Sequence, residues 1–175
     1  TLSLHDALPI SKKQRLKIAL CTASPIGSMI SPEATQAAKQ AADFLAAAGH
    51  EIIEIPYPVD GAALIRSYYQ MNGAETTAMM NSIQQGLGRP IRKEEIEPFS
   101  WTMHQFGQKI PAATYVHSLQ LWDQAAVTME ELFQKFDLFL SPTTAFSAPK
   151  INEDLQSEHI RQRMEQAAEL TEAEL

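Results

Sequence analysis

Three hydroxyl side chains, close together in the sequence, offer the strongest chemistry in this chain. Ser141, Thr143 and Thr144 follow the short apolar run 138–140, and Pro142 lies among them. Proline has no amide hydrogen to give to a sheet, so a central strand ends there. In open α/β sheets, ligands bind beyond the carboxyl ends of the strands. The pattern predicts that these three residues line a substrate pocket, although hydroxyls that only satisfy the backbone of a turn would look the same.

The remaining reactive side chains lack the partners that catalysis or metal binding requires. His50, Glu51 and Glu54 have no metal-ligand spacing, and the two glutamates would fall on opposite faces of a strand. Other reactive side chains are more simply explained by local structure. They are the single histidines His104 and His117, the thiol of Cys21 in an apolar run, and the acidic helix start at residues 94–97. These residues predict no metal, no cofactor and no complete catalytic set.

A strand–helix–strand unit is expected to build the sheet that positions the hydroxyls. Residues 16–21 are almost continuously apolar, as interior parallel strands are. Ser31 followed by Pro32 predicts a capped helix start, and Gly49 predicts its end. Residues 51–55 form a second apolar segment. Two strands joined by a helix in this way run parallel in one sheet.

Helices are predicted to fill the middle of the chain before a third strand at 138–140. One is expected over 62–85 with an interruption at Gly73, and another within 94–109, either kinked or starting late at Pro98. The clearest helix begins at Pro111 and carries an apolar stripe expected to pack on a sheet: Tyr115, Leu119, Trp122, Ala126, Met129, Phe133 and Phe136. An exposed helix is expected over 158–169. The fold class is therefore α/β, a mixed or parallel sheet of about three strands flanked by several helices.

Composition and charge narrow the range of partners. The chain has 175 residues, of which 45% are hydrophobic, and a net charge of −7. Acidic chains of this kind are poor partners for nucleic acid or anionic membranes, so neither is expected. No apolar run approaches the ~20 residues of a membrane span, and no secretory leader is recognisable. With a single cysteine, a cytoplasmic location is expected; the oligomeric state is left open.

Both ends of the sequence look unlike the ends of a natural domain. Residues 1–10 match the in-frame translation of a common sequencing-adapter oligonucleotide, so this segment is expected to be a non-native scar. The chain stops just after Thr171 and Glu174, a pattern that opens helices. Residues 11–175 are therefore expected to be part of a single domain, truncated at both ends.

Several segments together resemble the later portion of amidase-signature hydrolases. The resembling segments are Leu16–Leu20, Ser31-Pro32-Glu33, Ala47–Ile52, Pro98–Trp101, Ala112–Tyr115 and, above all, Phe136–Thr143, which is similar to that family's aromatic-Asp-hydrophobic-Pro-Thr segment. The similarity extends over most of residues 16–151. It is greatest to the branch that includes 6-aminohexanoate cyclic-dimer hydrolases.

The resemblance implies amide hydrolysis by a serine nucleophile, a second serine in a cis peptide and a lysine. The lysine must be neutral to accept a proton, and backbone amides would stabilise the oxyanion. Those residues belong to a glycine- and serine-rich signature that this sequence does not contain, so no catalytic residue is transferred to it. The expected function is a fragment of an amidase for small-molecule amides, inactive alone. Two alternatives remain, an aminoacyl-tRNA amidotransferase subunit and a non-catalytic α/β binding domain.

Overall fold

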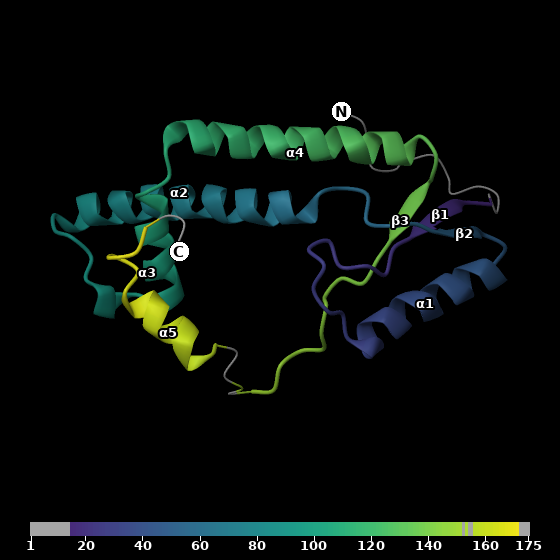
Figure 1. Ribbon diagram of the computed structural model, residues 1–175, viewed down its shortest axis with the longest axis horizontal. Coiled ribbons are helices and arrows are strands. Elements are labelled where there is room, and N and C mark those ends of the chain that lie inside the picture. Colours follow the sequence, from purple (N-terminus) through teal and green to yellow (C-terminus); the bar gives the residue numbers. More distant parts are fainter. Residues whose placement is uncertain (1–14, 152, 154–155, 172–175) are drawn as a thin grey trace, which may run out of the picture. The chain divides into compact units, whose positions relative to one another are not determined.

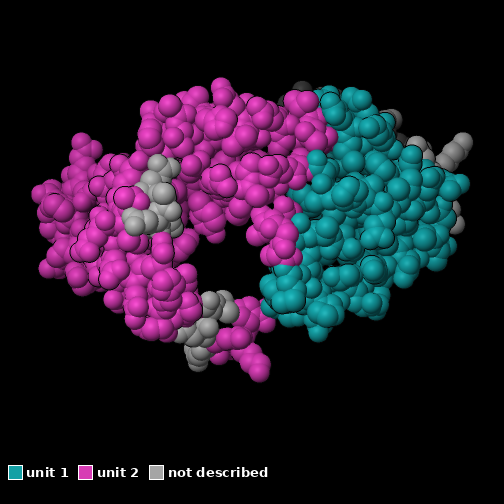
Figure 2. Space-filling model, viewed as in Figure 1, with its two compact units in different colours: residues 1–24, 29–58, 130–147 teal, residues 25–28, 59–129, 148–175 magenta. Residues whose placement is uncertain are grey.

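The computed structural model describes residues 15–151, 153 and 156–171, which form two compact units. Figure 2 colours the units separately. Among the described residues, the first contains 15–24, 29–58 and 130–147, and the second contains 25–28, 59–129, 148–151, 153 and 156–171. The first unit contains the sheet, whereas the second is helical (Figure 1).

The sheet of the first unit has three parallel strands in the order β2-β1-β3. These are β1 (Lys17–Leu20), β2 (Glu51–Glu54) and β3 (Leu138–Leu140). Ile18 of the central strand is in register with Ile52 on one side and Leu138 on the other. The predicted α/β class, with about three strands, is confirmed, and the sheet is parallel rather than mixed.

Helix α1 (Pro32–Ala47) connects β1 to β2, as the local signals predict. The Ser31 side chain accepts a hydrogen bond from the amide of Ala34 at 3.2 Å, and this satisfies one of the free donors of the first turn. After the helix, Gly49 has φ +98, a backbone angle that favours glycine. The apolar cluster of this unit contains the buried residues Leu20, Ala38 and Ala42, with Ile52 and Leu140 packed against them.

The amino ends of the strands are fixed by side chains as well as by the sheet. Asp137 accepts a hydrogen bond from the amide of Lys17 at 2.8 Å and donates its own amide to the Lys17 carbonyl at 2.8 Å. The Lys17 ammonium lies 5.2 Å from the centroid of the Phe136 ring. His50 Nδ1 accepts from the amide of Leu16 at 3.2 Å. The Phe-Asp pair that begins the family-like segment thus aligns β3 with β1.

In the second unit, α2 (Gly61–Leu87) runs without a break through Gly73. The predicted interruption there is wrong, because Gly73 is buried where α3 (Pro98–Gly107) crosses closely. A side chain at Gly73 would meet the Phe106 ring at 2.7 Å. The late start of α3 at Pro98 is confirmed. Glycine here allows two backbones to approach rather than ending a helix.

The apolar stripe predicted on α4 (Ala112–Phe133) is not buried. Leu119, Trp122 and Phe133 are 40%, 41% and 49% exposed, so the prediction that this stripe packs on a sheet is wrong for them, as is a core position for Trp122. The buried residue of α4 is Ser118, whose hydroxyl contacts Gln70 Oε1 at 2.9 Å. A polar contact with α2, rather than the aromatic stripe, therefore anchors α4 in the second unit.

The last described segment is more buried than its polar sequence suggests. Helix α5 (Glu158–Glu165) lies against α3, and Met164 and Ala167 are buried, so the expectation of an exposed helix is only partly right. The Lys109 ammonium donates to the carbonyls of Ala167, Ala168 and Leu170, which ties this segment to the end of α3. The helix start expected at 171–174 lies mostly outside the described residues.

Across the described helices, none combines the length and apolarity that crossing a bilayer requires.

Candidate functional site

A cavity of about 330 Å³ lies in the first unit, between α1 and the segment that follows β3. One wall is made by four alanines of α1, and the other by residues 140–144. All three hydroxyl residues singled out from the sequence, Ser141, Thr143 and Thr144, line it. A cavity of this size is at the lower end of the range for small-molecule sites.

Two of the three hydroxyls are available to a ligand. Thr144 Oγ1 donates to the Phe146 carbonyl at 3.0 Å, so this hydroxyl satisfies a backbone acceptor of the turn. The hydroxyls of Ser141 and Thr143 form no hydrogen bond with any other residue that the structure describes. Ser141 is half-buried, and Thr143 is exposed. The structure thus brings the three residues to one cavity, and their role toward a substrate stays a prediction.

The position of the cavity follows from the order of the strands. The chain leaves β1 through α1 to reach β2 on one side, whereas β3 lies on the other side of β1. In open α/β sheets, ligands bind beyond the carboxyl ends of the strands, and residues 141–144 directly follow the carboxyl end of β3. Two backbone bonds hold that edge: Cys21 N to Leu140 O at 2.9 Å, and Ser31 N to Ala145 O at 2.8 Å.

The alanine wall is the part of the site that the sequence did not reveal. Ala34, Ala37, Ala38 and Ala41 line the cavity. From the sequence, Ala34, Ala38 and Ala41 are expected only to share one face of the helix, and Ala37 is not singled out. Ala38 does pack in the core, whereas Ala37 and Ala41 are exposed and border the open space. The available signal is the absence of any larger apolar residue at 37 and 41, since a leucine at either position would occupy the cavity.

The other candidate residues have local structural roles, as the sequence suggests. Glu51 pairs with Arg15 at 3.5 Å, and Glu54 Oε1 accepts from the Thr22 hydroxyl at 3.5 Å. Cys21 is fully buried directly after β1. Within residues 15–171, as far as they are described, no three histidine, cysteine or acidic side chains gather as a metal site.

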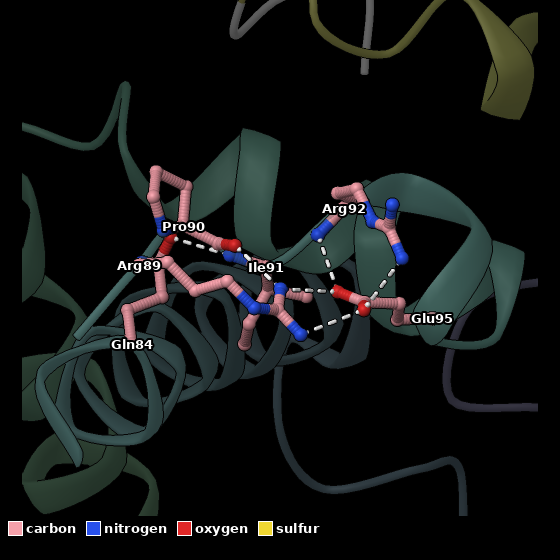
Figure 3. Close-up of polar contacts among 6 residues, drawn as sticks. All are labelled: Gln84, Arg89, Pro90, Ile91, Arg92 and Glu95. Carbon is pink, nitrogen blue, oxygen red and sulfur yellow. Dashed lines mark hydrogen bonds and ion pairs between the residues drawn. The ribbon is translucent and has the colours of Figure 1, made fainter. Parts of the chain in front are cut away.

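Glu95, in the acidic run before α3, forms ion pairs with two arginines. Glu95 lies in a short 3-10 helix, Lys93–Glu95, and not in the first turn of α3 as expected. Figure 3 shows its carboxylate between Arg89 and Arg92, with N–O distances of 2.9 to 3.1 Å. Hydrogen bonding from Arg89 above all, and then from the Arg92 amide, lowers the pKa of Glu95 to about 2. A second cavity of about 410 Å³ is lined by Arg89, Pro90 and Arg92, but Glu95 already neutralises much of this charge.

His104 is the buried titratable group of the second unit. Its side chain is on α3, 7% of the residue is exposed, and Nδ1 has no hydrogen-bond partner among the described residues. Its Nε2 lies 3.0 Å from Gln108 Nε2. Burial lowers the pKa of His104 because the imidazolium would lose its hydration.

The chain is therefore expected to lose stability as the pH falls below the ordinary histidine pKa of ~6.5. The unfolded state binds the His104 proton first, so this stabilisation is complete above that pH and declines as the pH approaches the lower folded-state pKa. Thermal unfolding of the parent chain between pH 7.5 and 5 should show the decline, and His104→Leu should flatten it. The exposed His117 supplies the control. An unchanged slope in His104→Leu, or a slope lost equally in His117→Gln, would contradict the assignment.

Known proteins match most of this chain in sequence and in fold. The family model described as "Amidase" matches residues 5–172. The chain belongs to the amidase family. A lipoamidase of Enterococcus faecalis is 34% identical over 165 residues, which are 92% of this chain and 22% of that protein. A 6-aminohexanoate-cyclic-dimer hydrolase of Pseudomonas sp. (strain NK87) is 23% identical, over 82% of this chain and 31% of that protein.

Solved amidase structures share the fold. A 6-aminohexanoate cyclic dimer hydrolase complexed with substrate superposes with a TM-score of 0.69 at 21% identity, covering 90% of this chain and 37% of the other. A bacterial aryl acylamidase of the amidase-signature family gives 0.69 at 18% identity, covering 82% of this chain and 30% of the other. This amidase chain thus spans about a fifth to a third of the curated relatives it matches and has part of the amidase-signature fold.

Proposed function

We propose that this chain is a part of an amide hydrolase that contributes one side of the substrate pocket and lacks the catalytic residues. The family match over residues 5–172 carries the proposal. It is supported by a cavity at the carboxyl edge of the sheet, lined by Ser141, Thr143 and Thr144. In the whole enzyme these residues would contact a small-molecule amide, while a Ser–cisSer–Lys set from another segment would cleave it. The family's named relatives cleave amides, which favours hydrolysis over the amidotransferase alternative.

The surface of the chain supports its being part of a larger protein. Large apolar side chains are exposed in both units, including Met29 at 78%, Phe44 at 74% and Trp122 at 41%. Large apolar side chains with this degree of exposure are candidates for contact with further protein. A cytoplasmic location and the absence of nucleic-acid partners remain predictions from the sequence.

The test compares the 175-residue chain with a longer protein in which the natural coding sequence upstream of Ser11 replaces residues 1–10. Hydrolysis of 6-aminohexanoate cyclic dimer, which frees an amine, and of lipoamide, which frees ammonia, is measured for both. The chain alone should hydrolyse neither amide above the buffer rate, and the extended protein should be active, because a serine–lysine set supplies the nucleophile and base. Hydrolysis by the chain alone that disappears in Ser141→Ala or Thr143→Val would overturn the proposal. Activity that appears only with a charged tRNA would instead favour the amidotransferase.

A further inference from the structure

Helix α5 and the residues that follow it are attached to the second unit by few buried side chains. Between residues 156 and 171, only Met164 and Ala167 are buried, and Ile160 is 45% exposed. The helix itself has eight residues, and isolated helices shorter than about 12 residues are marginal in water. Residues 156–171, here called the C-terminal strap, therefore depend on their contacts with α3 to stay folded.

The Lys109 ammonium makes the main polar contact of the C-terminal strap. It donates to the Ala167 carbonyl at 2.9 Å, to the Ala168 carbonyl at 3.4 Å and also to the Leu170 carbonyl. An ammonium has three donors, so these carbonyls engage all of them. Among the described residues, no carboxylate forms an ion pair with Lys109. Backbone carbonyls just beyond α5 thus stabilise the lysine charge, at the end of the helix where its dipole also favours a cation.

The two helices beneath this contact pack on each other without the C-terminal strap. Gly107 of α3 lies against the backbone of Gly73 in α2, and the Thr77 hydroxyl donates to the His104 carbonyl at 2.9 Å. Lys109 follows the C-cap of α3, so it belongs to this well-packed pair. Regions with few buried contacts open locally at a lower free-energy cost than the rest of a fold. The segment that Lys109 holds is such a region, whereas α2 and α3 are not.

We propose that the C-terminal strap detaches from α3 as one unit while α2 and α3 stay folded, and that the charge of Lys109 sets how often it detaches. The described residues between the cavity wall at 140–144 and Ser157, the N-cap of α5, form neither helix nor strand. Helix α5 is therefore the next regular element after that wall. Detachment frees the chain from residue 148 onward, so the C-terminal strap is a conformational device that limits the motion of the segment leading away from the cavity.

Amide hydrogen exchange on the 175-residue chain tests the proposal with two substitutions of the same residue. Lys109→Met keeps the length of the side chain and removes its charge, whereas Lys109→Arg keeps the charge. Hydrogen bonds from a charged donor change an opening equilibrium by about tenfold or more, so Lys109→Met should speed exchange at residues 160–170 by at least that factor. Lys109→Arg should have a clearly smaller effect. Exchange in α2 and α3 should stay as in the parent chain for both variants.

Lys93 supplies a matched control, because it is the other lysine that contacts the C-terminal strap. Its Nζ lies 3.4 Å from the Glu165 carbonyl, and the residue is exposed. A single contact of that length is weak. Lys93→Met therefore removes an equal charge and should change exchange at residues 160–170 much less than Lys109→Met does.

Three outcomes would overturn the inference. Unchanged exchange at residues 160–170 in Lys109→Met would mean that Lys109 does not hold the C-terminal strap. Faster exchange by the same factor in α2 and α3 would mean that the strap has no opening of its own. Equal effects of Lys109→Met and either Lys109→Arg or Lys93→Met would mean that the charge at position 109 does not set the opening. None of these results bears on the proposed amide hydrolase function, which is tested by hydrolysis in the extended protein.

Discussion

Replacing Gly107 by alanine is expected to unfold the helical unit or to cost about 3 kcal/mol or more of unfolding free energy. Gly107 is the last residue of α3 and is buried against α2. A Cβ atom there would overlap the backbone carbonyl of Gly73 and the Thr77 hydroxyl. That carbonyl is backbone in the middle of a 27-residue helix and cannot rotate away. The two helices would have to separate, and the Thr77-to-His104 hydrogen bond of 2.9 Å would be lost.

Gly86→Ala supplies the matched control in α2. Apart from its own turn of helix, no atom of the described residues lies within 4 Å of the Cβ position at Gly86, so the added methyl meets no packed neighbour. Alanine is favoured over glycine in a helix by about 1 kcal/mol, so this variant should be as stable as the parent chain or more stable. Urea unfolding followed by circular dichroism compares the three proteins. If Gly107→Ala unfolded at the same urea concentration as Gly86→Ala, α2 and α3 would not pack as closely as described.

Two other glycines, Gly49 and Gly73, illustrate how far the sequence predicts the fold. Gly49 follows a complete helical pattern and is correctly predicted as a stop, since the signal is local. Gly73 has the same local appearance of a helix breaker, yet α2 continues through it. What decides the outcome is the approach of Gly107, 34 residues later, which no local pattern contains. Propensity and capping are local, whereas close helix packing depends on pairs of distant residues.

In the candidate site, too, some residues could be predicted from local sequence and others could not. Residues 141–144 were predictable because proline and hydroxyls after an apolar run mark the carboxyl end of a strand. The alanines of α1 were not, because small residues at helical spacing are ordinary in packed helices. Only the pairing of β1 with β3, more than 100 residues apart, brings α1 beside residues 140–144. The exposed apolar stripe of α4 was also not predicted correctly. An apolar pattern shows that a helix face tends to be buried, but it does not show which element covers that face.

Replacing Ile18 by alanine is expected to cost about 2 to 5 kcal/mol, the usual range for a buried isoleucine. Ile18 is fully buried in the middle strand, and the residues paired with it are on both flanking strands. Alternation along β1 places it on the same face as Leu20, which packs with Ala38 and Ala42 of α1. The first unit has few other large buried side chains to compensate. Since folded domains are stable by only about 5 to 15 kcal/mol, this loss should remove a large share of the chain's unfolding free energy.

Leu138→Ala is the control, because it removes a similar volume from the residue in register with Ile18. Leu138 is 45% exposed on an edge strand, so its loss should cost less than half as much as that of Ile18. Urea unfolding measures both, and amide hydrogen exchange at residues 138–144 reports the edge that carries the cavity. Ile18→Ala should raise exchange there, since Ser141 and Thr143 depend on the β1–β3 pairing for their position. Equal costs for the two variants, or unchanged exchange after Ile18→Ala, would mean that the site is held by the 141–147 segment itself and not by the sheet.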